Sequence, residues 1–166
     1  MTDTECDEKK SRCERESDRI QKFFVRPAFL SLTIGIPFCL FKLLFGIIAF
    51  RLGEQDGSVL SWFGLIIIIW ATADLLMNIG RSTFDLLGRS APFDYCTIAQ
   101  AGRIVDRPMV FLAIDTLLTF SIICYMLWSG WITGLTRIES YLWYTATTLN
   151  LISLSLVSLY NEIRRA

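Results

Sequence analysis

Three ionisable side chains stand inside long apolar stretches, and they are the residues of this chain best placed to do chemistry: Lys42, Asp74 and Asp115. A charged side chain costs about 2.5–3.5 kcal/mol at the centre of a membrane-spanning helix. Each of the three should therefore face protein or water rather than lipid. Such groups either fix helix packing through hydrogen bonds and an ion pair, or carry a proton or a cation, or bind a ligand or a lipid head group.

The two aspartates have polar neighbours one helical turn away, because Asn78 follows Asp74 and Thr119 follows Asp115. Counted from the ends of their apolar stretches, both carboxylates lie about 9 Å deep on the same side of the membrane. If the two helices are neighbours, mutual repulsion would protonate one aspartate. Alternatively, Arg81 could reach back along the helix and neutralise Asp74.

Lys42 shares its helix face with the small residues Gly35, Cys39 and Gly46, which allow another helix to approach closely. Counted from the opposite side, Lys42 and Asn150 both lie about 14 Å deep. The sequence therefore allows a direct contact between these two side chains.

A charged stripe continues the spacing of Asp74 and Asn78 beyond the apolar segment, at intervals of three or four residues. Such spacing puts the side chains on one side of a helix that leaves the membrane. Together with two arginines of the next segment, the stripe is a candidate surface for a partner or for lipid head groups. These charged residues are Arg81, Asp85, Arg89, Arg103 and Arg107.

Four apolar segments must position these groups. The chain is 53% hydrophobic with zero formal net charge, and its charges are concentrated between the apolar segments and at the two ends. A spanning helix needs about 20 apolar residues. We therefore expect an all-α polytopic membrane protein, a bundle of four transmembrane helices at about 29–50, 59–80, 109–132 and 141–160. Pro37 should make the first helix irregular, since it lacks a backbone donor.

The central loop should itself be structured. The second helix is expected to continue past the membrane and to stop near Gly88. The segment 94–105 has apolar residues at helical spacing, which predicts a short amphipathic helix on the membrane surface or a packed connector. At the start of the third apolar segment, Asp106 is expected to cap the helix and Pro108 to occupy its first turn.

Lysine and arginine are distributed unevenly between the two sides. With four spans, thirteen of these residues fall on the side of both termini and two on the other side, so the positive-inside rule places the termini in the cytoplasm. We expect a cell (inner or plasma) membrane protein with a charged cytoplasmic tail, 1–26, a transmembrane domain, 27–160, and a short cytoplasmic tail, 161–166. Aromatic residues should mark the outer boundary: Phe50, Trp62, Phe63, Trp128, Trp131, Tyr141, Trp143 and Tyr144.

Several function classes are disfavoured by composition. Histidine is absent and the five cysteines form no close pair, which argues against a metal site, a cofactor or a disulfide framework. No phosphate-binding loop or nucleophile motif occurs, and no basic excess indicates nucleic acid, so no enzyme is expected. We expect a structural or accessory subunit of a membrane complex or a homo-oligomer, with lipids and other subunits as partners. The alternative is a small ion or proton channel or transporter component that uses Lys42, Asp74 and Asp115.

Overall fold

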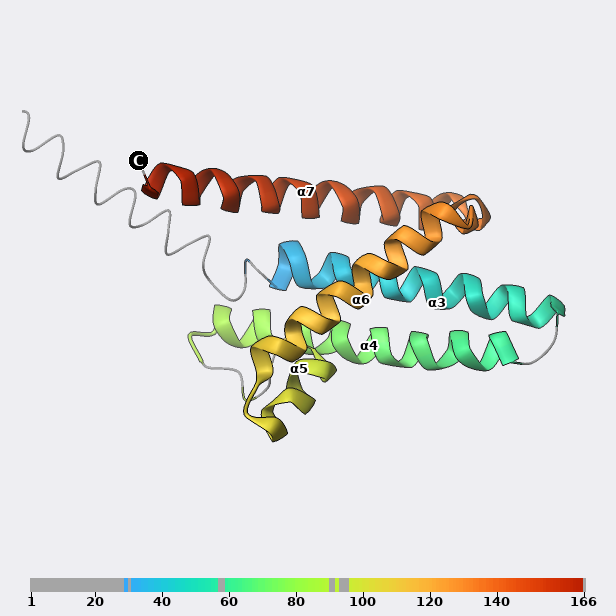
Figure 1. Cartoon of the computed structure of the whole chain (residues 1–166), viewed down its shortest axis with the longest axis horizontal. Helices are drawn as coiled ribbons and strands as arrows, with labels where there is room; N and C mark the ends of the chain where they lie inside the picture. The colour runs from blue at the N-terminus through green and yellow to red at the C-terminus, as the bar shows by residue number, and fades with distance from the viewer. Residues whose placement is uncertain (1–28, 30, 57–58, 90–91, 93–95, 166) are drawn as a thin grey trace, which may run out of the picture.

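The computed structural model describes residues 29, 31–56, 59–89, 92 and 96–165, and the predicted tail 1–26 lies outside this part (Figure 1). All regular structure in the described residues is helical. Four helices are long and apolar enough to cross a membrane: Ser31–Gln55, Val59–Leu86, Pro108–Trp128 and Arg137–Leu159. The predicted all-α bundle of four membrane-spanning helices is therefore confirmed.

The first spanning segment combines a π-helical turn, η1 (Ser31–Gly35), with the helix α3 (Ile36–Asp56). Pro37 is the second residue of α3, two positions after the end of this turn, and is buried. A proline cannot donate to the carbonyl four residues earlier, and π-helical turns commonly absorb such a gap. The irregularity predicted at Pro37 thus takes the form of a wider turn at the start of the helix.

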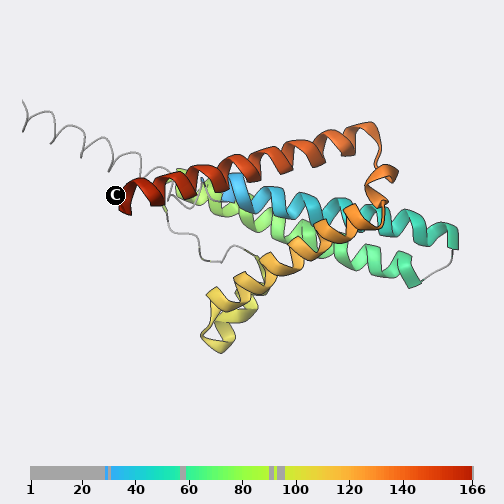
Figure 2. The same ribbon diagram turned by 45° about the horizontal axis from the view of Figure 1, so that its top comes forward.

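The helix α3 is the centre of the bundle. It packs against α4 (Val59–Leu86), α6 (Pro108–Trp128) and α7 (Arg137–Arg165), which surround it in both views (Figures 1 and 2). In the most apolar window of each segment, 56% of the first is buried but only 17–22% of the other three. The outer three helices therefore present most of their apolar surface to the surroundings.

Glycines hold α3 and α4 together as an antiparallel hairpin. A Cβ atom on Gly64 would overlap the backbone nitrogen of Phe50, and one on Gly53 would overlap that of Ser61. A Cβ on Gly46 would lie 3.0 Å from the backbone nitrogen of Ile68. Small residues of this kind let membrane helices approach until their backbones touch.

The helix α4 ends at Leu86, and Gly88 follows with a φ of 69°. This left-handed glycine closes the helix, because the amide of Arg89 donates to the carbonyl of Phe84 at 2.9 Å. The predicted stop near Gly88 is thus confirmed.

A short helix, α5 (Thr97–Gly102), and a 3-10 turn, η2 (Arg103–Val105), then pack against the start of α6. The helix expected in 94–105 is present, and its location on the membrane surface stays a prediction. Pro108 is the first residue of α6, as predicted. The predicted cap was wrong: Asp106 has a left-handed backbone (φ 55°), and Arg107 precedes the helix without a side-chain cap.

The bundle has two distinct ends. The last turn of α3, the first turn of α4 and the turn η3 (Trp131–Gly134) lie at what we call the turn end, and α5 marks the opposite, α5 end (Figure 1). The helices α6 and α7 meet at the turn end, and α6 then crosses the bundle obliquely and diverges from α7 toward the α5 end (Figure 2). The α5 end is therefore the more open one.

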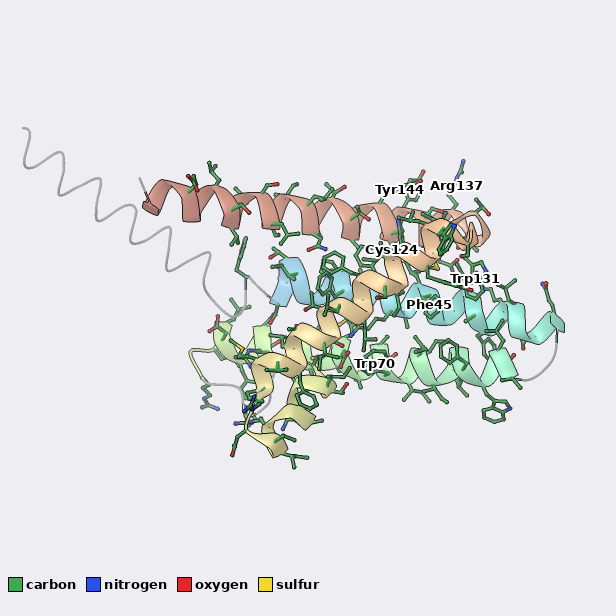
Figure 3. All side chains as sticks on the ribbon, viewed as in Figure 1. Phe45, Trp70, Cys124, Trp131, Arg137 and Tyr144 are labelled. Carbon is green, nitrogen blue, oxygen red and sulfur yellow. The ribbon has the colours of Figure 1, made fainter. Side chains whose placement is uncertain are left out.

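Aromatic rings pack the turn end. Phe45 of α3 stacks on Trp131 of η3 at 5.7 Å between ring centroids, and Tyr125 meets Trp131 edge-on at 5.1 Å (Figure 3). Trp143 departs from the predicted boundary belt, because it is only 4% exposed and packs edge-on against Phe41. One member of the predicted belt is thus part of the core.

Candidate functional site

The three charged side chains within the bundle meet at one point. Lys42 Nζ donates to Asp74 Oδ2 at 2.8 Å and to Asp115 Oδ1 at 2.6 Å. All three residues are at most 5% exposed. This ionic cluster joins α3, α4 and α6, so the fold does bring together the residues that the sequence singled out.

The level of the cluster follows from the helix ends. Lys42, Asp74 and Asp115 each lie about four helical turns from the terminus of their helix that belongs to the turn end. At about 1.5 Å per residue, all three are about 20 Å from the turn end. Lys42 is therefore deeper than the sequence predicted. The reason is that α3 does not end at Phe50 but continues to Asp56.

The expected contact between Lys42 and Asn150 is not formed. Successive residues of a helix point about 100° apart. Phe41 faces Trp143 of α7, while Lys42 turns toward α4 and α6. Asn150 is buried on α7, and its Oδ1 accepts no hydrogen bond from the described residues. The prediction was wrong because depth along a helix does not determine the direction of a side chain.

Asp74 has a second set of partners that the sequence did not indicate. Its Oδ1 accepts from the backbone nitrogen of Thr97 at 2.7 Å and from the Thr97 hydroxyl at 2.8 Å. A free amide at a helix start favours a negative group, which makes α5 a cap on this carboxylate. Asp74 is thus fully buried with both oxygens occupied. Among the described residues, the cation that binds Asp74 is Lys42, at the place where Arg81 had been one expected alternative. Protonation of one of the two aspartates stays a prediction.

An aromatic ring completes the surroundings of the lysine. Lys42 Nζ lies 4.4 Å from the ring centroid of Trp70, which is one helical turn before Asp74 on α4. A ring face attracts a cation, most strongly where water is excluded. The four-residue spacing of Trp70 and Asp74 is the sequence signal that could have indicated this contact.

The neighbouring polar residues support the cluster from the backbone side. Asn78 donates to the carbonyl of Asp74 at 3.0 Å and to Cys39 Sγ at 3.5 Å. Thr119 donates to the carbonyl of Asp115 at 2.9 Å. Thr119 thus binds the backbone of its own helix, whereas Asn78 also links α4 to α3 through Cys39.

The cluster carries one net negative charge when all three groups are ionised, since one ammonium faces two carboxylates. Uncompensated charge is costly in a low-dielectric interior. One bound proton or one further cation would balance it.

A cavity of about 280 Å³ adjoins the cluster between α3, α4, α5 and α6. Lys42 and Asp115 form part of its wall, and Met109, an exposed residue at the start of α6, marks the α5 end of the space. The other lining residues are mainly apolar: Ile34, Gly35, Phe38, Cys39, Asn78, Cys96, Leu112 and Thr116.

A dry barrier separates the cluster from the turn end. Buried apolar side chains fill the space between helices on this side, and each is at most 8% exposed. No charged residue belongs to this packed cluster of described residues. The barrier consists of Phe41, Leu44, Phe45, Ile48, Ile67 and Met126. The apolar layer therefore lies on the turn-end side of the ionic cluster, and the cavity lies on its α5 side.

The predicted charged stripe divides at the α5 end. Arg81 and Asp85 are half-buried on α4, whereas Arg89, Arg103 and Arg107 are exposed. Arg103 Nη1 donates to the carbonyl of Pro92 at 3.3 Å. The exposed arginines thus present positive charge at the end of the bundle that carries α5.

A second ion pair lies at the turn end and was not predicted. Arg51 binds Glu139 through two nitrogens, at 2.9 Å and 2.5 Å, and Glu139 also accepts from the backbone nitrogen of Thr136. This bidentate pair joins α3 to α7. Its residues adjoin the predicted ends of spans, where charges are common, and no spacing in the sequence distinguishes them.

Comparisons with protein-family models, with curated proteins and with solved structures found no match. In the described residues, no group of three or more histidine, cysteine or acidic side chains could hold a metal ion. The geometry of the bundle and its ionic cluster is therefore the basis for a functional proposal.

Proposed function

We propose that this membrane protein is a structural or accessory subunit of a larger membrane assembly or of a homo-oligomer. One observation carries the proposal: α3 is more than half buried by the other helices, while α6 and α7 diverge and leave long apolar faces uncovered by the described residues (Figure 2). The charged groups of the interior bind one another, which is what a packing role requires.

The face of α7 supports association with another helix. Thr145, Thr148 and Ser155 are exposed on α7, and spacings of three and seven residues put them on one side. Hydroxyl and small side chains are typical of helix contacts within membranes. We therefore assign the partner, a second copy or another subunit, to this face.

The mass of the purified protein in lipid nanodiscs tests this proposal. We expect a particle that contains more than one chain or a stoichiometric membrane partner. Thr148→Trp should convert it to a monomer, whereas Thr72→Trp, on the exposed side of α4, should leave the mass unchanged. A stable monomer of the unmodified chain without a partner would contradict the proposal, and an unchanged mass for Thr148→Trp would contradict the assigned face.

A second candidate is a small ion or proton channel or transporter component that uses Lys42, Asp74 and Asp115. The net charge of the ionic cluster favours this candidate, since a bound proton or cation would compensate the one negative charge of the cluster. The dry barrier argues against a path through a single chain. Flux into proteoliposomes that persists after neutral replacement of all three residues would contradict this candidate.

For localisation we propose a cell (inner or plasma) membrane with both termini in the cytoplasm. The thirteen-to-two distribution of lysine and arginine supports this orientation. In that orientation the exposed Arg89, Arg103 and Arg107 lie at the cytoplasmic surface, where they would contact anionic lipid head groups.

A further inference from the structure

The cavity beside the ionic cluster has the composition of a ligand site. Phe38 of α3 and Leu112 of α6 line it, and Ile34 and Met109 line it further toward the α5 end. Small-molecule sites are mostly apolar with a few polar groups that fix orientation. Here the polar groups are gathered at the ionic cluster, so an elongated occupant would have one defined end.

Asp115 is the group of the cluster that is available to an occupant. The Asp74 side chain is completely buried and both its oxygens are engaged, whereas the side chain of Asp115 is 7% exposed and lines the cavity. Asp115 Oδ1 binds Lys42, and among the described residues no nitrogen or hydroxyl donates to its other oxygen. The other group close to this carboxylate is the Cys96 thiol, which is a weak donor.

The charge of the ionic cluster determines whether a cation or an anion fits the cavity. Among the described residues of the cavity wall and directly behind it, the charged ones are Lys42, Asp74 and Asp115, and they leave one negative charge uncompensated. A cation placed at Asp115 would neutralise the cluster. An anion would meet the same carboxylate and add to the imbalance.

The lining distinguishes an organic from an inorganic cation. A hard metal ion needs about six oxygen ligands. Beyond Asp115, the described lining residues that offer side-chain oxygens are Asn78 and Thr116, and apolar carbons form most of the remaining wall. An ammonium group attached to an apolar body satisfies both parts of the site, because its charged end meets Asp115 and its body contacts Phe38 and Leu112.

We propose that this cavity binds a small organic amine in its protonated form, with the ammonium at Asp115 and the apolar body between α3 and α6. This inference is independent of whether the protein is a subunit or a transporter component. It assigns a ligand class to the one carboxylate oxygen of the cluster that has no strong donor.

Equilibrium binding of 2-phenylethylamine to the full chain in lipid nanodiscs tests the proposal, with empty nanodiscs to subtract partitioning into lipid. We expect saturable binding with one amine per chain. Two probes of nearly the same shape isolate the charge: neutral 2-phenylethanol should compete at least tenfold more weakly, and anionic phenylacetate should not compete. Absence of saturable binding, or equal competition by the alcohol, would overturn the proposal.

Two substitutions locate the site. Asp115→Asn leaves Lys42 and Asp74 as a neutral pair and should weaken amine binding at least tenfold. Leu112→Trp fills the cavity without changing the ionic cluster and should abolish binding. Leu117→Trp, at an exposed position of the same helix, is the matched control and should bind as the unmodified chain does.

The variants remain decisive if one of them fails to fold. Each is first checked for monodisperse elution and helical content, and Leu112→Trp decides the location when Asp115→Asn does not fold. Unchanged binding in a folded Leu112→Trp or a folded Asp115→Asn would overturn the assignment of the site. Loss of binding in Leu117→Trp would equally overturn it.

Discussion

Lys42 Nζ lies 2.6 Å from Asp115 Oδ1, although the two residues are 73 positions apart in the chain. This contact fixes α6 to α3 at a level where both are buried, and the bond from Lys42 to Asp74 fixes α4 at the same level. The register of three helices thus depends on one ammonium group. Substitutions can measure the contribution of this ionic cluster to stability separately from that of the other contacts that hold the bundle together.

Replacing the lysine should destabilise the bundle strongly. Lys42→Met leaves two buried carboxylates without a cation, and removal of one partner of a buried ion pair typically costs about 3–5 kcal/mol. The free energy of unfolding, from SDS titration in mixed micelles followed by circular dichroism, measures the effect. Arg51→Met is the control: the Arg51 side chain is 43% exposed and that of Glu139 12%, so water screens this pair more than the cluster and its loss should cost less than the loss of Lys42. Equal losses in both variants would refute a special role for the cluster.

The close approach of α3 and α4 should not tolerate a methyl group. In Gly64→Ala the new Cβ overlaps the backbone of Phe50, and overpacking of this kind costs about 1–3 kcal/mol. Gly134→Ala is the matched control, because a Cβ there has open space within 4 Å. The same SDS titration should show a loss for Gly64→Ala and none for Gly134→Ala. A wild-type transition for Gly64→Ala would show that the hairpin is looser than described.

The hydroxyl of Thr97 should hold α5 against the bundle. Thr97→Val removes a hydrogen bond to the Asp74 carboxylate, and bonds to charged groups contribute about 1.5–3 kcal/mol. Hydrogen exchange at the amides of α5 should therefore accelerate, while exchange in α3 stays unchanged. Thr72→Val, whose hydroxyl binds only the carbonyl of its own helix, should alter neither. Unchanged α5 exchange in Thr97→Val would contradict the capping role.

The thiol of Cys96 should react slowly and with a steep pH dependence. Burial, reinforced by the charge of Asp115, raises the pKa of Cys96 from 9.0 to about 12. The thiolate is the nucleophile, and at pH 8 the fraction of Cys96 present as thiolate is about a thousandfold lower in the folded chain than in the unfolded chain. Iodoacetamide alkylation of a variant with Cys96 as its only cysteine, before and after denaturation in SDS, measures this ratio.

The same shift determines how stability depends on pH. Between pH 9 and 12 the unfolded chain ionises Cys96 while the folded chain keeps it protonated, so the contribution of this thiol to stability is complete below pH 9 and is lost as the pH rises to 12. Cys96→Ala should remove this part of the alkaline loss. Equal alkylation rates in the folded and denatured chain would contradict both expectations.

The orientation of the chain can be measured directly. Glu54 and Glu162 are exposed and lie at opposite ends of the bundle. With the remaining cysteines replaced, Glu54→Cys should react with an impermeant maleimide on intact cells. Glu162→Cys should react only after permeabilisation. The reverse pattern would exclude cytoplasmic termini.

The number and approximate positions of the spanning helices were predictable because length and hydropathy determine which segments can cross a membrane. Their ends were less predictable, since α3 continues past Phe50 to Asp56. The stop near Gly88 and Pro108 at a helix start were predictable, since both depend on local backbone chemistry. Burial of Lys42, Asp74 and Asp115 was predictable for an energetic reason, namely the cost of charge in lipid.

The partners within the site were not predictable from these patterns. Lys42 was matched to Asn150 by depth, but its direction depends on how α4, α6 and α7 are placed around α3, which is a property of the whole fold. Thr97 and Cys96 lie in the central loop, and only the packing of α5 on α6 brings them to the cluster. Local periodicity contains no information on that packing.

The order of the residues in the ionic cluster has a consequence for biosynthesis. Lys42 emerges from the ribosome 32 residues before Asp74 and 73 residues before Asp115. At about 5–20 residues per second, the lysine waits about 2–6 s for its first carboxylate and about 4–15 s for its second. During this interval an unpaired lysine in lipid would cost about 2.5–3.5 kcal/mol on insertion scales. This cost favours insertion of α3 and α4 together, as one hairpin, over insertion of α3 alone.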